Sequence, residues 1–182
     1  MTARRTSLVA ALALCLSLAG PAATAQARTT AEAVGLPIIV ESAEQRAAAE
    51  YPAAKFHGAR AKFGTPLWDP RDVRAWSVDF YPGPGGPKWG FSYLYSAEGR
   101  FQSTAAWRKG VGNDPVAKFT MTQFEAFDLV RAAGYRTHPF TQLYLSQPRV
   151  LDPEPIYYFC FDHEVVGVGA TTSKVFKNLF RC

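Results

Sequence analysis

Apolar side chains recur at every fourth position within residues 41–51, ESAEQRAAAEY, and this spacing predicts a helix. Ser42 followed three positions later by Gln45 is the capping-box pattern typical of a helix start. Pro52 predicts the end, because proline disfavours helical geometry in the residue before it.

A second helix is predicted within residues 120–134, TMTQFEAFDLVRAAG. Thr122 and Glu125 repeat the capping-box pattern, and Gly134 is placed to end the helix in a left-handed conformation. Its apolar face contains Phe124, Ala126, Phe127, Val130 and Ala133.

Each helical stretch is followed by four runs rich in aromatic and β-branched residues, bounded by Gly, Pro, Asn, Asp and Ser, which is typical of strands. Trp89, Phe91, Tyr93 and Tyr95 alternate with smaller residues, which predicts one core-facing and one water-facing side of a sheet. The first four runs are residues 55–63, 73–81, 88–96 and 100–107, and the second four are 138–147, 156–161, 165–170 and 174–180.

The order of one helix followed by four strands therefore occurs twice along the chain, which indicates a duplication. We predict an α+β fold of two tandem units, each a helix packed on a four-stranded antiparallel sheet. The units span residues 28–112 and 113–182, joined near Asn113-Asp114-Pro115.

Asp162-His163-Glu164 raises the question of a metal or proton-transfer site. The three residues lie between two predicted strands, in the length range of hairpin connections, and consecutive turn residues converge poorly on one ion. We interpret them as a solvated turn and predict no metal and no cofactor.

Residues 1–27 are typical of a secretory signal peptide. Arg4 and Arg5 precede an apolar run that is too short to span a bilayer. Cleavage after Ala25 or Ala27 fits the small residues found there. We expect an exported protein, periplasmic or secreted, and leave the export route open.

Removal of this segment takes away two arginines and lowers the formal net charge from +5 to +3. The remaining basic residues are scattered along the chain, whereas nucleic-acid binding requires a clustered basic stripe. We therefore expect no nucleic-acid partner, and no second apolar run predicts a transmembrane segment. The oligomeric state stays open.

Two cysteines remain after cleavage, Cys160 and Cys182. In an exported chain an even cysteine count predicts a disulfide between them. A meander would separate their strands by a third strand, so the last residues must curl over the sheet for the sulfurs to meet. The alternative is a buried thiol at Cys160 and a frayed terminus.

The second half resembles a PepSY-type unit. The resemblance rests on the helix around MTQFEAFDLVRAAG and on the hairpin IYYFCFDHEVVGVGATTSKV, with Thr172-Ser173 where the family usually has a glycine in the turn. AWSVDFY, KWGFSYLYS and AEGRF give the first half a similar pattern. A tandem of such units is also similar in architecture to β-lactamase-inhibitor-type proteins. The resemblance implies a non-catalytic module that binds or restrains enzymes.

Candidate binding residues flank the two long connections between strands. Tyr81 and Trp89 border the Gly/Pro-rich loop, and Arg149 and Asp152 lie in QPRVLDPEP. Prolines restrict such loops and reduce the entropy lost on binding. The alternative is that Trp89 belongs to the core and that both loops are inert.

We predict no catalytic residues, because the chain has no Gly-x-Ser-x-Gly elbow and no phosphate-loop motif. The predicted function is an exported protein-binding module with a protein partner in the envelope or medium, including inhibition or regulation of a secreted or envelope enzyme. The alternatives are a small envelope hydrolase using His57 or His138 with a carboxylate, and a structural envelope component.

Overall fold

The computed structural model describes residues 32–84, 89–107, 114–135, 138–149, 154–162, 164–177 and 179. Residues from Ala31 onward form one compact unit. The predicted signal peptide lies outside the described residues, as does Asn113 of the predicted join at Asn113-Asp114-Pro115, so both stay predictions. No helix among the described residues is long and apolar enough to cross a membrane.

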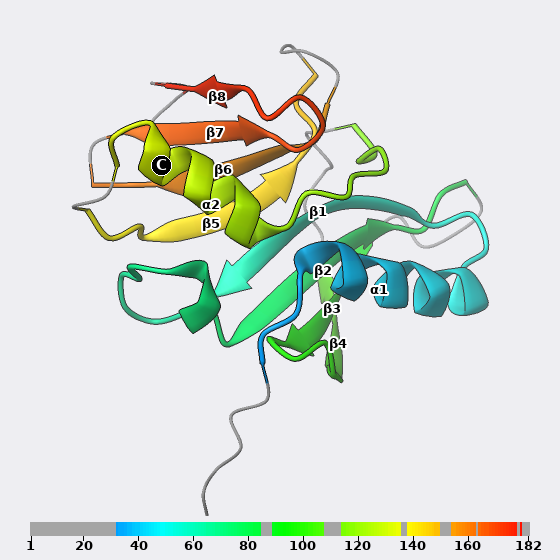
Figure 1. The fold of residues 1–182 in the computed structure, drawn as a ribbon. Coiled ribbons are helices and arrows are strands. Elements are labelled where there is room, and N and C mark those ends of the chain that lie inside the picture. Colours follow the sequence, from blue (N-terminus) through cyan, green and yellow to red (C-terminus); the bar gives the residue numbers. More distant parts are fainter. Residues whose placement is uncertain are drawn as a thin grey trace, which may run out of the picture. The chain divides into compact units, whose positions relative to one another are not determined.

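The described residues form two α-helices and one eight-stranded antiparallel sheet, with both α-helices on the same face of the sheet (Figure 1). The first half contains α1 (Leu36–Glu50), β1 (Lys55–Lys62), the short 3₁₀ helix η1 (Pro70–Asp72), β2 (Ala75–Tyr81), β3 (Gly90–Ser96) and β4 (Phe101–Trp107). The second contains α2 (Gln123–Ala132), β5 (Gln142–Ser146), β6 (Ile156–Cys160), β7 (Val165–Gly169) and β8 (Val175–Phe176).

The two halves share this sheet through their first strands. The strand order is β4-β3-β2-β1-β5-β6-β7-β8, so β1 and β5 pair at the centre and the later strands of each half extend outward. Gly58 lies opposite Ser146, and Arg60 lies opposite Tyr144. The α+β class is confirmed, and the chain is consistent with two helix-plus-four-strand halves. The two separate four-stranded sheets of the prediction are instead one continuous eight-stranded sheet, because β1 pairs with β5.

Helix α1 begins earlier than the sequence indicated. Leu36, not a residue after Ser42, is its first residue, and the N-cap is Gly35, which offers no side-chain bond. The Ser42–Gln45 pattern lies inside the helix and does not cap it. The predicted end is confirmed, because Glu50 is the last helical residue.

The amide of Gln123, at the start of α2, caps α1 instead. Its Oε1 accepts a hydrogen bond from Leu36 N at 2.7 Å, and its Nε2 donates to the Val34 carbonyl at 3.1 Å. Gln123 is 1% exposed. The first turns of the two helices therefore lie together, and one half completes the helix of the other.

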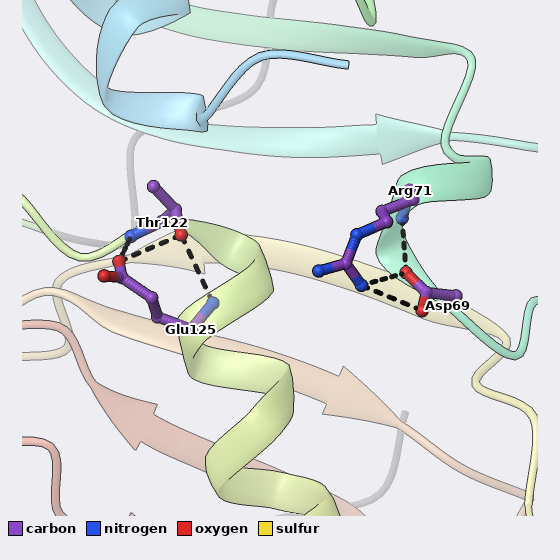
Figure 2. Close-up of polar contacts among 4 residues, drawn as sticks. All are labelled: Asp69, Arg71, Thr122 and Glu125. Atoms are coloured by element: carbon purple, nitrogen blue, oxygen red, sulfur yellow. Dashed lines mark hydrogen bonds and ion pairs between the residues drawn. The ribbon is translucent and has the colours of Figure 1, made fainter. Parts of the chain in front are cut away.

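Helix α2 follows its prediction closely. Thr122 Oγ1 accepts from the Glu125 amide at 3.2 Å while the Glu125 carboxylate accepts from the Thr122 amide at 2.7 Å (Figure 2). The 3₁₀ helix η1 has a similar local cap, in which Asp69 Oδ1 accepts from the Arg71 amide at 2.8 Å (Figure 2). Gly134 has φ +110°, which confirms the left-handed helix end.

The core lies between the helices and the sheet. Trp76, Tyr93, Phe140 and Phe159 are among its largest side chains, and each is at most 1% exposed. In the first half, β2 shows the predicted alternation between buried and partly exposed residues. Burial of large aromatic side chains on one face is what fixes the register of such a sheet.

Three strands depart from the prediction of a water-facing side. Strand β3, for which the alternation was predicted, is buried at every residue except Leu94, and β6 and β7 are buried on both faces. A second apolar cluster forms away from the helices, where Leu179 packs against Ile156, Tyr158, Cys160 and Val165. Gly167 permits this contact, because a Cβ there would lie 2.5 Å from the Leu179 Cδ1 atom. The Leu179 amide also donates to the Val165 carbonyl at 3.3 Å, so at this point the chain still runs beside β7. Cys182 lies outside the described residues, and the bridge stays a prediction.

The interpretation of Asp162-His163-Glu164 as a connection between strands is confirmed. Strand β6 ends at Cys160 and β7 begins at Val165, and the Phe161 amide donates to the Glu164 carbonyl at 2.9 Å. The Glu164 carboxylate accepts a hydrogen bond from the Tyr135 hydroxyl at 3.0 Å. This side chain therefore attaches the hairpin to the end of α2.

Candidate functional site

Three of the four predicted binding residues lie at one end of the sheet. Tyr81 ends β2 and Trp89 precedes β3, and they are 36% and 39% exposed. Tyr81 pairs with Lys55 at the beginning of β1, and the beginning of β1 lies beside the end of β5. Arg149 follows β5 and so lies at this same end.

Arg149 is held by an ion pair rather than presented alone. Its Nε lies 3.0 Å from Asp114 Oδ1, and both side chains are more than half exposed. Such exposed pairs contribute about 0–1 kcal/mol. Gln147 strengthens the same junction, because its Oε1 accepts from the Ala117 amide at 2.8 Å. Asp152 lies outside the described residues, and a binding role for all four stays a prediction.

The face of the sheet opposite the helices carries a polar and aromatic group that we name the open-face cluster: His57, Arg60, Asp79, Tyr81 and Tyr144. These residues come from the neighbouring strands β1, β2 and β5. They occupy the positions that alternate with the buried core residues on the other face. Both helices lie on that other face (Figure 1).

Asp79 is the acidic member of the open-face cluster. Its Oδ1 accepts hydrogen bonds from the hydroxyls of Ser92 at 2.6 Å and Ser77 at 3.1 Å. Burial raises the pKa of Asp79, while the two serine hydrogen bonds and the charges of Arg60 and Lys62 act in the opposite direction. A partly buried carboxylate therefore lies among basic side chains, which is a polar environment suited to recognition.

Tyr144 is fixed by a neighbour on the adjacent strand. Its ring stacks on that of Tyr158 with centroids 4.7 Å apart. Burial raises the pKa of Tyr144, with Arg60 acting in the opposite direction, and burial raises the pKa of Tyr158 to about 12. Both phenols are therefore protonated near neutral pH. Tyr144 is also half-buried, so it presents a rigid ring with little freedom left to lose on binding.

Sequence reasoning missed Arg60, Asp79 and Tyr144 as members of a surface. The signal was present in AWSVDFY, where Ser77, Asp79 and Tyr81 alternate with the three core residues. Those positions identify one face of one strand. Which residues of β1 and β5 join them depends on the central β1–β5 pairing, which the sequence did not specify.

The described histidines do not share a site. His57 lies near the beginning of β1, whereas His138 precedes β5 and so lies toward the opposite end of the β1–β5 pair. His163 is outside the described residues. Among the described residues no group of three or more His, Cys, Asp or Glu side chains could hold a metal ion.

A hollow of about 430 Å³ lies on the helix side, between α1 and residues 116–120. Its lining includes the apolar Ile38, Phe56 and Phe119, with Glu44 and Lys118 as charged members. Burial raises the pKa of Glu44, and the charge of Lys118 opposes this rise. The lining includes neither His57 nor His138, so it does not form the histidine–carboxylate cleft that a hydrolase would need.

Glu154, which the sequence placed in a long loop, has a structural position. Its carboxylate is 7% exposed and accepts hydrogen bonds from the Thr171 and Thr172 amides at 3.1 and 3.0 Å and from the Thr172 hydroxyl at 2.6 Å. Three donors on one buried carboxylate fix the turn between β7 and β8. Glu154 is therefore not available to a partner.

Comparison with known proteins supports the fold. The chain is similar to the crystal structure of a "putative lipoprotein" (CD1622) from Clostridium difficile 630, with a TM-score of 0.52 and 11% identity, covering 80% of this chain and 92% of that chain. At this identity the likeness shows the fold alone. No protein-family model and no curated protein matches the chain. The resemblance to PepSY-like units therefore stays an interpretation of the sequence pattern.

Proposed function

We propose that this chain is an exported, non-catalytic protein-binding module, and that the open-face cluster together with Trp89 is its contact surface. The partner is a protein of the envelope or medium, and inhibition or regulation of a secreted or envelope enzyme is the form of binding that we favour. The observation that best supports this proposal is the set of accessible aromatic and charged side chains on three central, hydrogen-bonded strands.

The composition of this surface fits protein recognition. Tyrosine, tryptophan and arginine dominate the binding energy of protein interfaces because they combine large contact area with hydrogen bonding. Tyr81 and Arg60 are exposed, and the ring of His57 lies 6.1 Å from that of Tyr81 in an edge-on arrangement. Strands hold these side chains in place before a partner arrives, which reduces the ordering cost of association.

The test is capture by the chain beginning at residue 28, immobilised and incubated with culture supernatant and envelope extract from its own source. Bound proteins are identified by mass spectrometry, and the affinity of each candidate is then measured with purified components. Tyr81→Ala and Arg60→Ala should each weaken binding by about fivefold or more, the effect of removing an interface anchor.

Trp68→Ala is the matched control. Trp68 is also an exposed aromatic residue, 59% exposed, but it lies in the connection between β1 and β2 outside the open-face cluster. Equal losses in the Trp68 and Tyr81 variants, or unchanged binding in the Tyr81 and Arg60 variants, would refute the proposed surface. Assays of captured enzymes with and without the chain test inhibition.

A further inference from the structure

Strand β4 forms a long open edge of the sheet. It is the terminal strand on one side, whereas the other side ends in β8, which has two residues. Among the described residues no strand pairs with the outer side of β4. An edge strand presents backbone N–H and C=O groups that can pair with another chain.

Proteins usually protect such edges with charges, prolines, bulges or a covering element. The β4 sequence, FQSTAAW, contains no charged residue and no proline. The one irregularity in its pairing with β3 lies near its start, so the ladder is regular from Ser103 to Trp107. The side chains of residues 101–106 are all exposed, although Arg46 of α1 reaches Phe101 at the start of the strand.

The beginning of β4 carries a basic and aromatic feature. The guanidinium carbon of Arg46 lies 3.8 Å from the centre of the Phe101 ring, and Phe101 is 37% exposed. Arg100 is adjacent and forms an exposed ion pair with Glu98 at 3.4 Å. The described residues give Arg46 no such ion pair. Glu50 approaches Tyr93 on the inner side of this region.

We propose that β4 binds an extended segment of another protein as a ninth, antiparallel strand. The segment is uncharged where it pairs with β4, and acidic residues at its carboxyl end contact Arg46. Antiparallel addition continues the pattern of the whole sheet. It also sets the polarity, because the carboxyl end of the incoming strand then lies beside Phe101. The small side chains from Ser103 to Ala106 leave room for the incoming side chains.

A second copy of this chain fits the edge less well. Its own β4 contains no aspartate or glutamate, so antiparallel pairing of two β4 strands would bring no carboxylate to Arg46. A segment that ends in acidic residues can pair with the backbone N–H and C=O groups of β4 and also place a carboxylate next to the Arg46 guanidinium. This surface is separate from the open-face cluster, so the two proposals fail independently.

The test uses two labelled peptides of equal composition and charge, TVTVTDD and DDTVTVT, titrated into the chain beginning at residue 28 and followed by fluorescence anisotropy. TVTVTDD should bind about tenfold more tightly, because only its acidic end meets Arg46 in an antiparallel strand. Two further peptides carry N-methyl groups on alternate backbone nitrogens, one along each edge of the strand. Methylation of the edge that pairs with β4 should abolish binding, and methylation of the other edge should leave it unchanged.

Arg46→Ala should weaken TVTVTDD by about fivefold, while Arg71→Ala serves as the matched control. Arg71 also lies over an aromatic ring, at 5.2 Å from the centre of Phe124, but it belongs to η1, which packs against α2. Tyr81→Ala should leave peptide binding unchanged. The proposal is overturned if the two peptides bind equally or not at all, if both N-methylated peptides bind as well as the unmodified one, or if sedimentation shows a dimer that the peptide dissociates.

Discussion

Replacing Gln123 with leucine should destabilise the fold, because it removes the side chain that caps α1. Leucine has a similar size, but it cannot accept from the Leu36 amide or donate to the Val34 carbonyl. Leu36 is 0% exposed, so water cannot replace the lost bond to its N–H group. Helix α1 has no side-chain cap of its own to compensate.

The magnitude follows from the cost of leaving buried polar groups without partners, which is about 1–3 kcal/mol each. Val34 is only half-buried, so its carbonyl is expected to recover part of this loss through water. Leucine also gains apolar burial of about 1 kcal/mol. We therefore expect Gln123→Leu to lower the free energy of unfolding by about 2–4 kcal/mol.

Urea denaturation followed by tryptophan fluorescence and circular dichroism measures this change. Gln45→Leu is the matched control, because Gln45 is exposed on α1 and its replacement should change stability by less than about 0.5 kcal/mol. Gln123→Glu separates the two bonds. Its carboxylate accepts but cannot donate, whereas its protonated form can do both, so this variant should approach the parent as the pH falls. Equal, pH-independent stability of the two Gln123 variants, or a leucine variant as stable as the parent, would refute the reasoning.

Three further predictions follow from local geometry. The Asp79→Asn variant should be more stable than the parent near neutral pH, because a carboxyl group whose pKa is raised by folding destabilises the folded state once it is ionised. The difference should shrink in acid, where Asp79 is protonated, and denaturation across pH 4–8 measures it. Ser173 has φ +61°, so Ser173→Gly should raise the free energy of unfolding by about 0.5–1 kcal/mol in a urea titration, and a loss would contradict the strain argument. The Cys160–Cys182 bridge should appear by mass spectrometry of the unreduced protein, and its reduction should cost about 3 kcal/mol in urea denaturation.

Local signals predicted the elements well. Both strand-rich halves appear, and the helix with the complete capping box begins at the predicted Thr122 cap. The start of α1 was missed for a physical reason. The true cap is Gln123, which lies 87 positions away from Leu36, and no local pattern encodes such a contact. The Ser42–Gln45 pattern was a coincidence within a helix that had already begun.

The candidate site was predicted only in part. Tyr81 and Trp89 are exposed as expected for binding residues, and so the reading of Trp89 as a fully buried core residue is wrong. The remainder of the open-face cluster comes from strands on either side of the central pairing. Arg60 lies beside Tyr144 only because β1 pairs with β5, and pairing between halves is a long-range choice that periodicity does not specify.

The shared sheet separates the two proposed contact surfaces, the open face and the β4 edge, from the packed helix side. Pairing β1 with β5 places both helices over one face, and the aromatic core fills the space between. The helix starts are packed so closely that a Cβ on Gly35 would lie 2.7 Å from Thr122 Cγ2. The helix side still contains the hollow of about 430 Å³ between α1 and residues 116–120. The two proposed contact surfaces lie elsewhere, on the strand face that the helices do not cover and along the edge where the sheet ends.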